Sequence, residues 1–171
     1  MLKKRLIFSL LVSDDLFMLS RNFNLQKVGN LNWIKENYNF NLISEAVDEL
    51  VVLDVGRFKK NIDSFSKVLE ELSHNCFVPL SAGGGIKNIQ DAYKLINSGS
   101  DKLVLNSLFY NNKKLVKEIA YTFGKQCIIC SIDYKLEENG QVQIYTLNGS
   151  KKVEITLEEA IKNAYDLGAG E

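Results

Sequence analysis

Charged residues stand at the entrance to one apolar, strand-like run of the sequence after another. These residues are Arg5, Glu49, Lys102 and Glu171. If the runs are neighbouring parallel strands, two cations and two anions meet at one end of a sheet or barrel. An isolated buried charge is costly, so such a cluster persists only when its members pair, and it can then act as a plug or gate. From the residues alone, a ring of salt bridges that only completes the fold is the simpler interpretation.

A glycine run, Gly83-Gly84-Gly85, follows an apolar run and precedes a helical pattern. Glycine lets the backbone approach an anion closely, while N–H groups at a helix start point towards it. The run therefore predicts phosphate binding at Gly84 and Gly85, and a tight turn that binds nothing is the alternative. Asn106 and Ser107 end the next strand and could donate to the same phosphate. The spacing is neither that of a Walker loop nor that of a dinucleotide fingerprint.

Carboxylates that end strands are candidates for acid–base chemistry. Asp133 closes the fifth apolar run, and acids at the carboxyl ends of barrel strands lie where substrates bind. A general acid or base is one interpretation of Asp133, and a solvated or capping residue is the other. Asp54 ends the second run in the same way and is a secondary candidate. His74, the only histidine, lies in a polar turn and is expected on the surface.

The three cysteines give little indication of redox or metal chemistry. Cys127 and Cys130 form a C-x-x-C pair, a spacing that redox and zinc sites use. The pair lies inside an apolar run, where cysteine behaves as a small hydrophobe and strand alternation points its members to opposite faces. We expect these two and Cys76 to be structural thiols, and we expect neither a metal nor a cofactor.

Short apolar runs must position these residues. Their richness in Val, Ile and Leu, without polar alternation, is typical of strands covered on both faces. The predicted strands are residues 5–12, 49–54, 77–81, 102–106 and 126–133. The predicted helices between them are residues 32–40, 61–72, 89–97 and 113–123. This alternation predicts an α/β fold with right-handed crossovers and a parallel sheet.

One insertion interrupts the alternation after Asp133. Residues 141–145 and 152–156 flank an Asn148-Gly149 pair, which predicts a hairpin before a helix over residues 157–167. The last four residues, 168–171, then look like a helix end that leads into a further strand.

The composition describes an ordinary globular chain. It has 171 residues, 46% of them hydrophobic, and residues 1–171 are expected to form one domain. Lys and Arg together number 21, as do Asp and Glu, so the net charge indicates neither a nucleic-acid partner nor a membrane partner. The N-terminal apolar run is too short to span a bilayer and has no cleavage site, so we expect a cytoplasmic protein.

Five strands and the start of a sixth do not close an eight-stranded barrel, which usually takes about 250 residues. An open remnant would leave a strand edge unpaired. We therefore expect a (β/α)8 TIM barrel that is present here only through strand 5 and the start of strand 6, incomplete at the C-terminus. A stand-alone open α/β domain is the alternative.

Several of these features occur in the order and approximate spacing of one family. They are Arg5 and its strand, residues 48–54, residues 83–86, Asp101-Lys102, Asn106-Ser107, residues 131–133 and residues 168–171. Over its whole length the chain resembles the cyclase subunit of imidazole glycerol phosphate synthase, a lyase of histidine biosynthesis. The resemblance implies a (β/α)8 barrel that binds a glutaminase subunit at its N-terminal face, receives ammonia through the barrel, and acts on a phosphorylated ribonucleotide.

The resemblance also assigns roles to residues. Arg5, Glu49, Lys102 and Glu171 match an ammonia gate. Gly85, Asn106 and Ser107 match one of the family's phosphate sites, and Asp133 matches one of its two catalytic aspartates.

The chain departs from the family at the other catalytic aspartate, where Leu11 stands. An aliphatic side chain cannot exchange a proton. The loop that follows lacks the family's lysine, and residues 55–58 lack its small and hydroxyl residues. In these respects the chain is similar to a subgroup from surface-polysaccharide pathways that is thought to supply ammonia to a sugar amidotransferase.

Three functions remain open from the sequence. The first is an enzyme subunit that uses or relays ammonia at a phosphate-binding rim. The second is a non-catalytic conduit and docking module that activates the glutaminase. The third, a related phosphoribosyl isomerase, is weaker because it needs no ammonia gate and would use an aspartate at Leu11.

Overall fold

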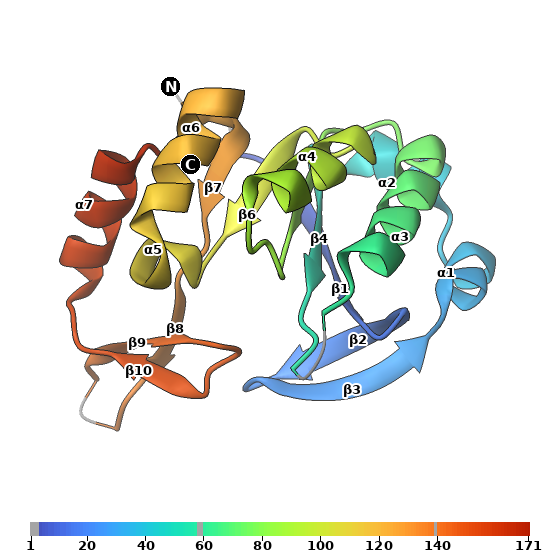
Figure 1. Ribbon diagram of the computed structural model, residues 1–171. Helices are drawn as coiled ribbons and strands as arrows, with labels where there is room; N and C mark the ends of the chain where they lie inside the picture. Colours follow the sequence, from blue (N-terminus) through green and yellow to red (C-terminus); the bar gives the residue numbers. More distant parts are fainter. Residues whose placement is uncertain (1–3, 58–59, 139) are drawn as a thin grey trace. The chain divides into compact units, whose positions relative to one another are not determined.

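The computed structural model describes residues 4–57, 60–138 and 140–171 (Figure 1). The chain divides into two compact units, Met1–Leu103 and Val104–Glu171, which are described separately below. One domain over residues 1–171 stays a prediction. Within the described ranges, no helix is long and apolar enough to cross a membrane.

The first unit is built on a largely parallel sheet. Its strands are β1 (Ile7–Ser13), β2 (Leu16–Arg21), β3 (Asn24–Gly29), β4 (Glu49–Asp54), β5 (Leu80–Gly83) and the start of β6 (Lys102–Leu105). They lie in the order β3-β2-β1-β4-β5-β6. β1, β4 and β5 pair in parallel, whereas β2 and β3 form an antiparallel hairpin beside β1. The Asp101 N–H donates to the Leu80 carbonyl at 2.7 Å, at the entrance to β6.

Four helices complete the first unit: α1 (Leu31–Asn37), α2 (Phe40–Ala46), α3 (Ile62–Asn75) and α4 (Ile89–Asn97). An asparagine caps the start of each, because its side-chain oxygen accepts a backbone N–H that has no partner inside the helix. The caps are Asn30, Asn39, Asn61 and Asn88. Leu69 of α3 and Leu95 of α4 are fully buried, as are Leu50 and Val52 of β4. These side chains belong to the core of the unit.

The second unit contains α5 (Leu108–Asn111), α6 (Lys113–Phe123), the short 3-10 helix η1 (Lys125–Cys127), β7 (Ile128–Cys130) and α7 (Leu157–Leu167). A separate antiparallel sheet joins β8 (Asp133–Leu136), β9 (Val142–Thr146) and β10 (Lys151–Val153). After α7, the Glu171 N–H donates to the Ile128 carbonyl, and the Cys130 N–H donates to the Glu171 carbonyl. The last residues therefore begin to pair with β7, as predicted for a helix end that leads into a strand.

Most predicted elements are confirmed. The helices over residues 89–97, 113–123 and 157–167 and the strand over residues 49–54 have the predicted bounds, and the hairpin of β9 and β10 is present. The predicted helix over residues 32–40 is instead two helices, because Tyr38 and Asn39 are extended and Asn39 caps α2. The predicted strand over residues 77–81 begins only at Leu80.

Two predictions need a larger correction. The strand predicted over residues 126–133 is wrong at both ends: β7 covers only Ile128–Cys130, and Asp133 opens β8 instead of closing a parallel strand. The hairpin of β2 and β3 was not predicted. Its turn places Asn22 and Phe23 at positive φ. An Asn-Gly pair would have predicted such a turn, but here phenylalanine stands where glycine is usual.

Candidate functional site

Glu49 is the centre of a charged cluster at the entrance to β4. Its side chain is only 2% exposed. Its Oε2 accepts from Arg5 Nη1 at 3.1 Å and lies 3.5 Å from Lys102 Nζ. The Ser81 hydroxyl donates to Oε1. The buried anion is thus compensated by two cations and a hydroxyl, as burial of a charge requires.

We call Arg5, Glu49 and Lys102 the strand-entrance cluster. Its cations differ in exposure, because the Arg5 side chain is 43% exposed and that of Lys102 is 19% exposed. Three of the four residues predicted to converge do so. Glu171 belongs to the second unit, so its place in the cluster stays a prediction.

The pairing of β1 with β4 places Leu11 on the same sheet face as Glu49. Side chains alternate along a strand, so Glu49 and Leu53 share one face of β4. Leu11 lies opposite Leu53 in the register. This face therefore carries the charged cluster at one end of the strands and an aliphatic side chain, in place of a carboxylate, at the other.

Asp54 points to the other face of β4. Alternation groups it with the buried Leu50 and Val52, away from Leu11. Its Oδ1 accepts from the Gly56 N–H at 2.8 Å. Burial raises the pKa of the Asp54 carboxyl, and the Gly56 N–H and the nearby Lys60 ammonium offset part of that rise. This geometry favours a role in holding the turn after β4 over a role in catalysis on the Leu11 face of the sheet.

A cavity of about 240 Å³ lies beside Asp54. Its lining residues are Val12, Asp14, Asp15, Asp54, Asn61, Ser64 and Phe65. The Ser64 hydroxyl donates to Asp15, and Asn61 is occupied as the cap of α3. These polar side chains of the lining therefore already form hydrogen bonds around the start of α3.

The glycine run forms a tight turn that only glycine fits. Gly84 has a φ of +99°, and a Cβ there would lie 2.2 Å from the Asp54 carbonyl oxygen. Gly85 has a φ of +82°, and a Cβ there would lie 3.0 Å from Cδ of Lys60. Close packing thus explains both glycines whether or not an anion binds. The approach of a lysine to this turn was not predicted from the sequence.

Lys60 joins the turn after β4 to the glycine run. Its Nζ donates to the Asp54 carbonyl at 2.5 Å. Burial lowers the pKa of Lys60, and the neighbouring Asp54 charge opposes that change. No sequence motif marks this lysine, because its contacts come from the turn geometry.

Asp133 meets Asn106 in the second unit. Asp133 is half-buried at the start of β8. Burial raises the pKa of its carboxyl, and a hydrogen bond from the Asn106 side chain lowers it. Tyr110, on α5, interacts electrostatically with both Asp133 and Cys130. Tyr110 was not predicted, because a tyrosine on a short helix carries no motif.

The predicted phosphate residues are divided between the two units. Gly84 and Gly85 lie in the first, whereas Asn106 and Ser107 lie in the second. Ser107 precedes α5 and makes no capping hydrogen bond with its side chain. A shared phosphate site of these four residues stays a prediction.

The cysteines are unpaired thiols. Burial raises the pKa of Cys130 to about 12, which keeps this thiol protonated and unreactive at neutral pH. Cys127 lies in η1 and Cys130 in β7. In the part of the chain that the structure describes, no group of three or more His, Cys, Asp or Glu residues could hold a metal ion. His74 is exposed in the last turn of α3, as predicted.

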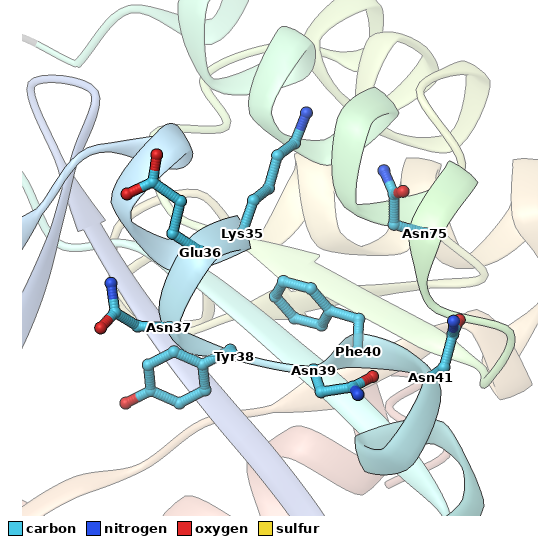
Figure 2. A pocket seen from close by; sticks show the side chains of 8 residues that line it. All are labelled: Lys35, Glu36, Asn37, Tyr38, Asn39, Phe40, Asn41 and Asn75. Carbon is cyan, nitrogen blue, oxygen red and sulfur yellow. The ribbon is translucent and has the colours of Figure 1, made fainter.

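An open pocket of about 470 Å³ lies between α1, the start of α2 and the end of α3 (Figure 2). Several of its polar side chains already have structural partners. Lys35 pairs with Glu71, Asn39 caps α2, and Asn75 Nδ2 donates to the Glu71 carbonyl. These three side chains are therefore already engaged in holding the helices.

Comparison with known proteins places the chain in a family. A family model described as "Histidine biosynthesis protein" matches residues 34–171. A protein of Parasynechococcus marenigrum named "Putative imidazole glycerol phosphate synthase subunit hisF2" is 40% identical over 161 residues, which cover 94% of this chain and 60% of that protein. "Imidazole glycerol phosphate synthase subunit HisF" of Bacillus cereus is 36% identical and that of Streptococcus mutans 34%, each over 100% of this chain and 67% of the relative.

The chain thus spans about 60–67% of the length of these relatives. The family model covers the whole second unit and, in the first unit, Glu49 and Lys102, whereas the Streptococcus mutans relative covers Arg5 as well. The chain belongs to the HisF-like family of histidine biosynthesis proteins.

Proposed function

We propose that the protein is a cyclase-subunit-like barrel of an imidazole glycerol phosphate synthase. It receives ammonia from a glutaminase subunit bound at the N-terminal face, and it uses the ammonia at a phosphate-binding rim, in the cytoplasm. The observation that carries this proposal is the buried Glu49 between Arg5 and Lys102. A cluster at the strand entrances in a member of this family is suited to control passage of a small neutral molecule.

Two features of the cluster support a role as a gate. Lys102 bonds Glu49 at 3.5 Å, longer than the 3.1 Å bond of Arg5, and lysine is a flexible point donor, whereas arginine holds a carboxylate with a planar fork. Rotation of Lys102 away from Glu49 therefore opens a path while Arg5 and Ser81 still compensate the anion. Glu171 would complete the gate.

At the rim, Asp133 acts as the general acid or base. Its raised pKa brings the neutral form closer to working pH, which suits a group that both accepts and releases a proton. For a phosphorylated substrate, the first unit offers the backbone N–H groups of the Gly84-Gly85 turn and the second offers the Ser107 hydroxyl. No cofactor or metal is part of this proposal.

Leu11 favours a second candidate function. It stands on the Glu49 face, where it cannot exchange a proton. A barrel that keeps the gate and lacks one of two acids suits an ammonia relay or docking subunit that serves a sugar amidotransferase in surface-polysaccharide biosynthesis. A phosphoribosyl isomerase is the weakest candidate, because it has no use for the strand-entrance cluster.

A turnover assay separates the first two functions. Full-length protein is supplied with ammonium salt and the phosphorylated aminoimidazole carboxamide ribonucleotide. Formation of imidazole glycerol phosphate supports the cyclase, and no product together with stimulated glutamine hydrolysis by the partner supports the relay. Leu11→Asp is the matched variant. If wild type is inactive and this variant is active, Leu11 is the cause of the loss.

The gate is tested with Lys102→Met, which keeps the aliphatic stem and removes the charge. We expect less ammonia to reach the product for each glutamine hydrolysed, with a smaller change in stability. Lys94→Met, on the exposed face of α4, is the control. Unchanged coupling in Lys102→Met would return the cluster to a purely structural role.

A further inference from the structure

The Asn106 side chain has an unusual imbalance of hydrogen bonds. Its amide group bonds the Asp133 carboxyl. Its Oδ1 is buried and has no hydrogen-bond partner among the residues that the structure describes. A buried acceptor without a donor is destabilising, and in native proteins such a group calls for an explanation such as a catalytic role.

This arrangement is poorly suited to a phosphate ligand, the role predicted for Asn106 from the resemblance. A phosphate oxygen accepts hydrogen bonds, so Oδ1 cannot bind it, and the NH₂ group is directed at Asp133. An ionised Asp133 hydrogen-bonded to the same amide would also repel a phosphate. Ser107, whose side chain makes no capping bond, keeps a hydroxyl donor for that purpose.

We propose that Asn106 is a positioning residue for Asp133 that holds the carboxyl group in both of its protonation states. When Asp133 is ionised, the Asn106 NH₂ group donates to the carboxylate. When Asp133 has taken a proton from the reacting ligand, the amide turns by half a rotation, and the now neutral carboxyl O–H donates to Oδ1. Asp133 alone gains and returns the proton. Asn106 exchanges one hydrogen bond for another, and its covalent bonds do not change. This inference rests on the proposed function, because it takes Asp133 to be the proton-transfer group.

The surroundings of Asp133 in the second unit suit such a role. Tyr110 of α5 interacts electrostatically with Asp133 and with Cys130 of β7, and burial raises the pKa of both Tyr110 and Cys130. Both therefore stay neutral when Asp133 changes charge. On β9, Tyr145 lies opposite Asp133 in the register, with Lys135 of β8 4.4 Å from the centre of its ring. Asn106 is a polar partner of Asp133 that can both donate and accept without titrating.

The test compares Asn106→Leu, which is close in volume and makes no hydrogen bond, with Ser107→Ala as the matched control. The pKa of Asp133 is followed by carbon-detected NMR of the carboxyl groups in full-length protein without substrate. A hydrogen bond to an ion is about twice as strong as one to a neutral group, so losing both bonds should raise the pKa of Asp133 by about one unit in Asn106→Leu. In turnover, kcat should fall at least about tenfold, with less change in KM.

Ser107→Ala should weaken the affinity for inorganic phosphate and leave the pKa of Asp133 unchanged. Asn106→Leu should instead change the pKa of Asp133 and leave phosphate affinity unchanged. The proposal is overturned if Asn106→Leu leaves the pKa of Asp133 unchanged, or if it weakens phosphate binding as Ser107→Ala does. Asn106→Ala replaces the leucine variant if circular dichroism shows that the latter is unfolded. If wild type has no turnover, the proposed function fails, and the titration still decides the role of Asn106.

Discussion

Glu49 in the first unit and Asp133 in the second are both buried or half-buried carboxylates, but their partners differ. Glu49 has two cations and a hydroxyl. Asp133 has a neutral amide, and its pKa is raised by burial. Opposite charges hold a buried carboxyl in its ionised form, whereas burial without them favours the neutral form. The difference teaches that cations compensate the burial of the first carboxylate, whereas a neutral amide offsets only part of the effect of burial on the pKa of the second.

The largest effect on stability is expected at Glu49. Glu49→Ala leaves Lys102 and the Ser81 hydroxyl without their shared partner. Removing one member of a buried ion pair costs about 3–5 kcal/mol, and we expect the lower end because Arg5 is partly solvated. Urea unfolding measures the loss. Lys94→Ala, in an exposed pair with Asp63, should cost less than about 1 kcal/mol. Equal losses in the two variants would remove the distinction between a fixed internal charge and a surface pair.

The second largest effect on stability is expected when a glycine of the first unit and one of the second are each replaced by alanine. Gly84→Ala in the first unit combines a positive φ with a Cβ position 2.2 Å from a carbonyl oxygen, and we expect a loss of about 3 kcal/mol. Gly124 in the second unit also has a positive φ, of +86°, and a Cβ there meets nothing within 4 Å. Gly124→Ala should therefore cost about 1 kcal/mol. Thermal unfolding of the two variants tests this order, and the reverse order would refute the close packing of the turn.

A smaller effect depends on pH. Because burial raises the folded pKa of Asp54 above its ordinary value of 3.8, its contribution to stability is fully present below that value and is lost as pH rises through the folded pKa. Asp54→Asn does not titrate and keeps an acceptor for the Gly56 N–H. The free energy of unfolding of this variant, minus that of the wild type, should therefore increase as pH rises from about 3.5 towards 7. A difference that stays constant over this range contradicts the interpretation.

The smallest effect on stability is expected at Asp133. Because its neutral form is favoured by burial, Asp133→Asn should change the free energy of unfolding by less than about 1 kcal/mol at neutral pH, in the stabilising direction. Ammonium-dependent turnover should instead fall about 10²- to 10⁴-fold. A large loss of stability with normal turnover would reverse the comparison, because Asp133 would then be the structural carboxylate.

Local signals in the sequence predicted much of the fold. The helix α7 begins at a Thr156–Glu159 capping box and ends before Gly168 at positive φ, and both signals can be read from neighbouring residues. The hairpin of β2 and β3 was missed because its turn uses Asn22 and Phe23 without glycine. The displacement of Asp133 from the end of one strand to the start of another was missed because an apolar run shows where a strand can form and not where its pairing ends.

The candidate site was predicted less completely. Family membership implies a (β/α)8 barrel, and the residues that carry the family pattern include Glu49, Lys102 and Asp133. Their partners were harder to foresee. Ser81, Lys60 and Tyr110 belong to no motif, and each contributes through a contact that depends on how turns and strands pack.

The sequence by itself determined where helices and strands form, because caps, glycine ends and apolar periodicity act over a few neighbouring residues. The tertiary structure decided which carboxylate receives compensating cations. Arg5 and Glu49 are 44 positions apart, and Glu49 and Lys102 are 53 apart, so parallel strand pairing alone brings them into contact. Compensation of a buried charge is a property of distance in space, and no short stretch of the chain contains both the charge and its partners.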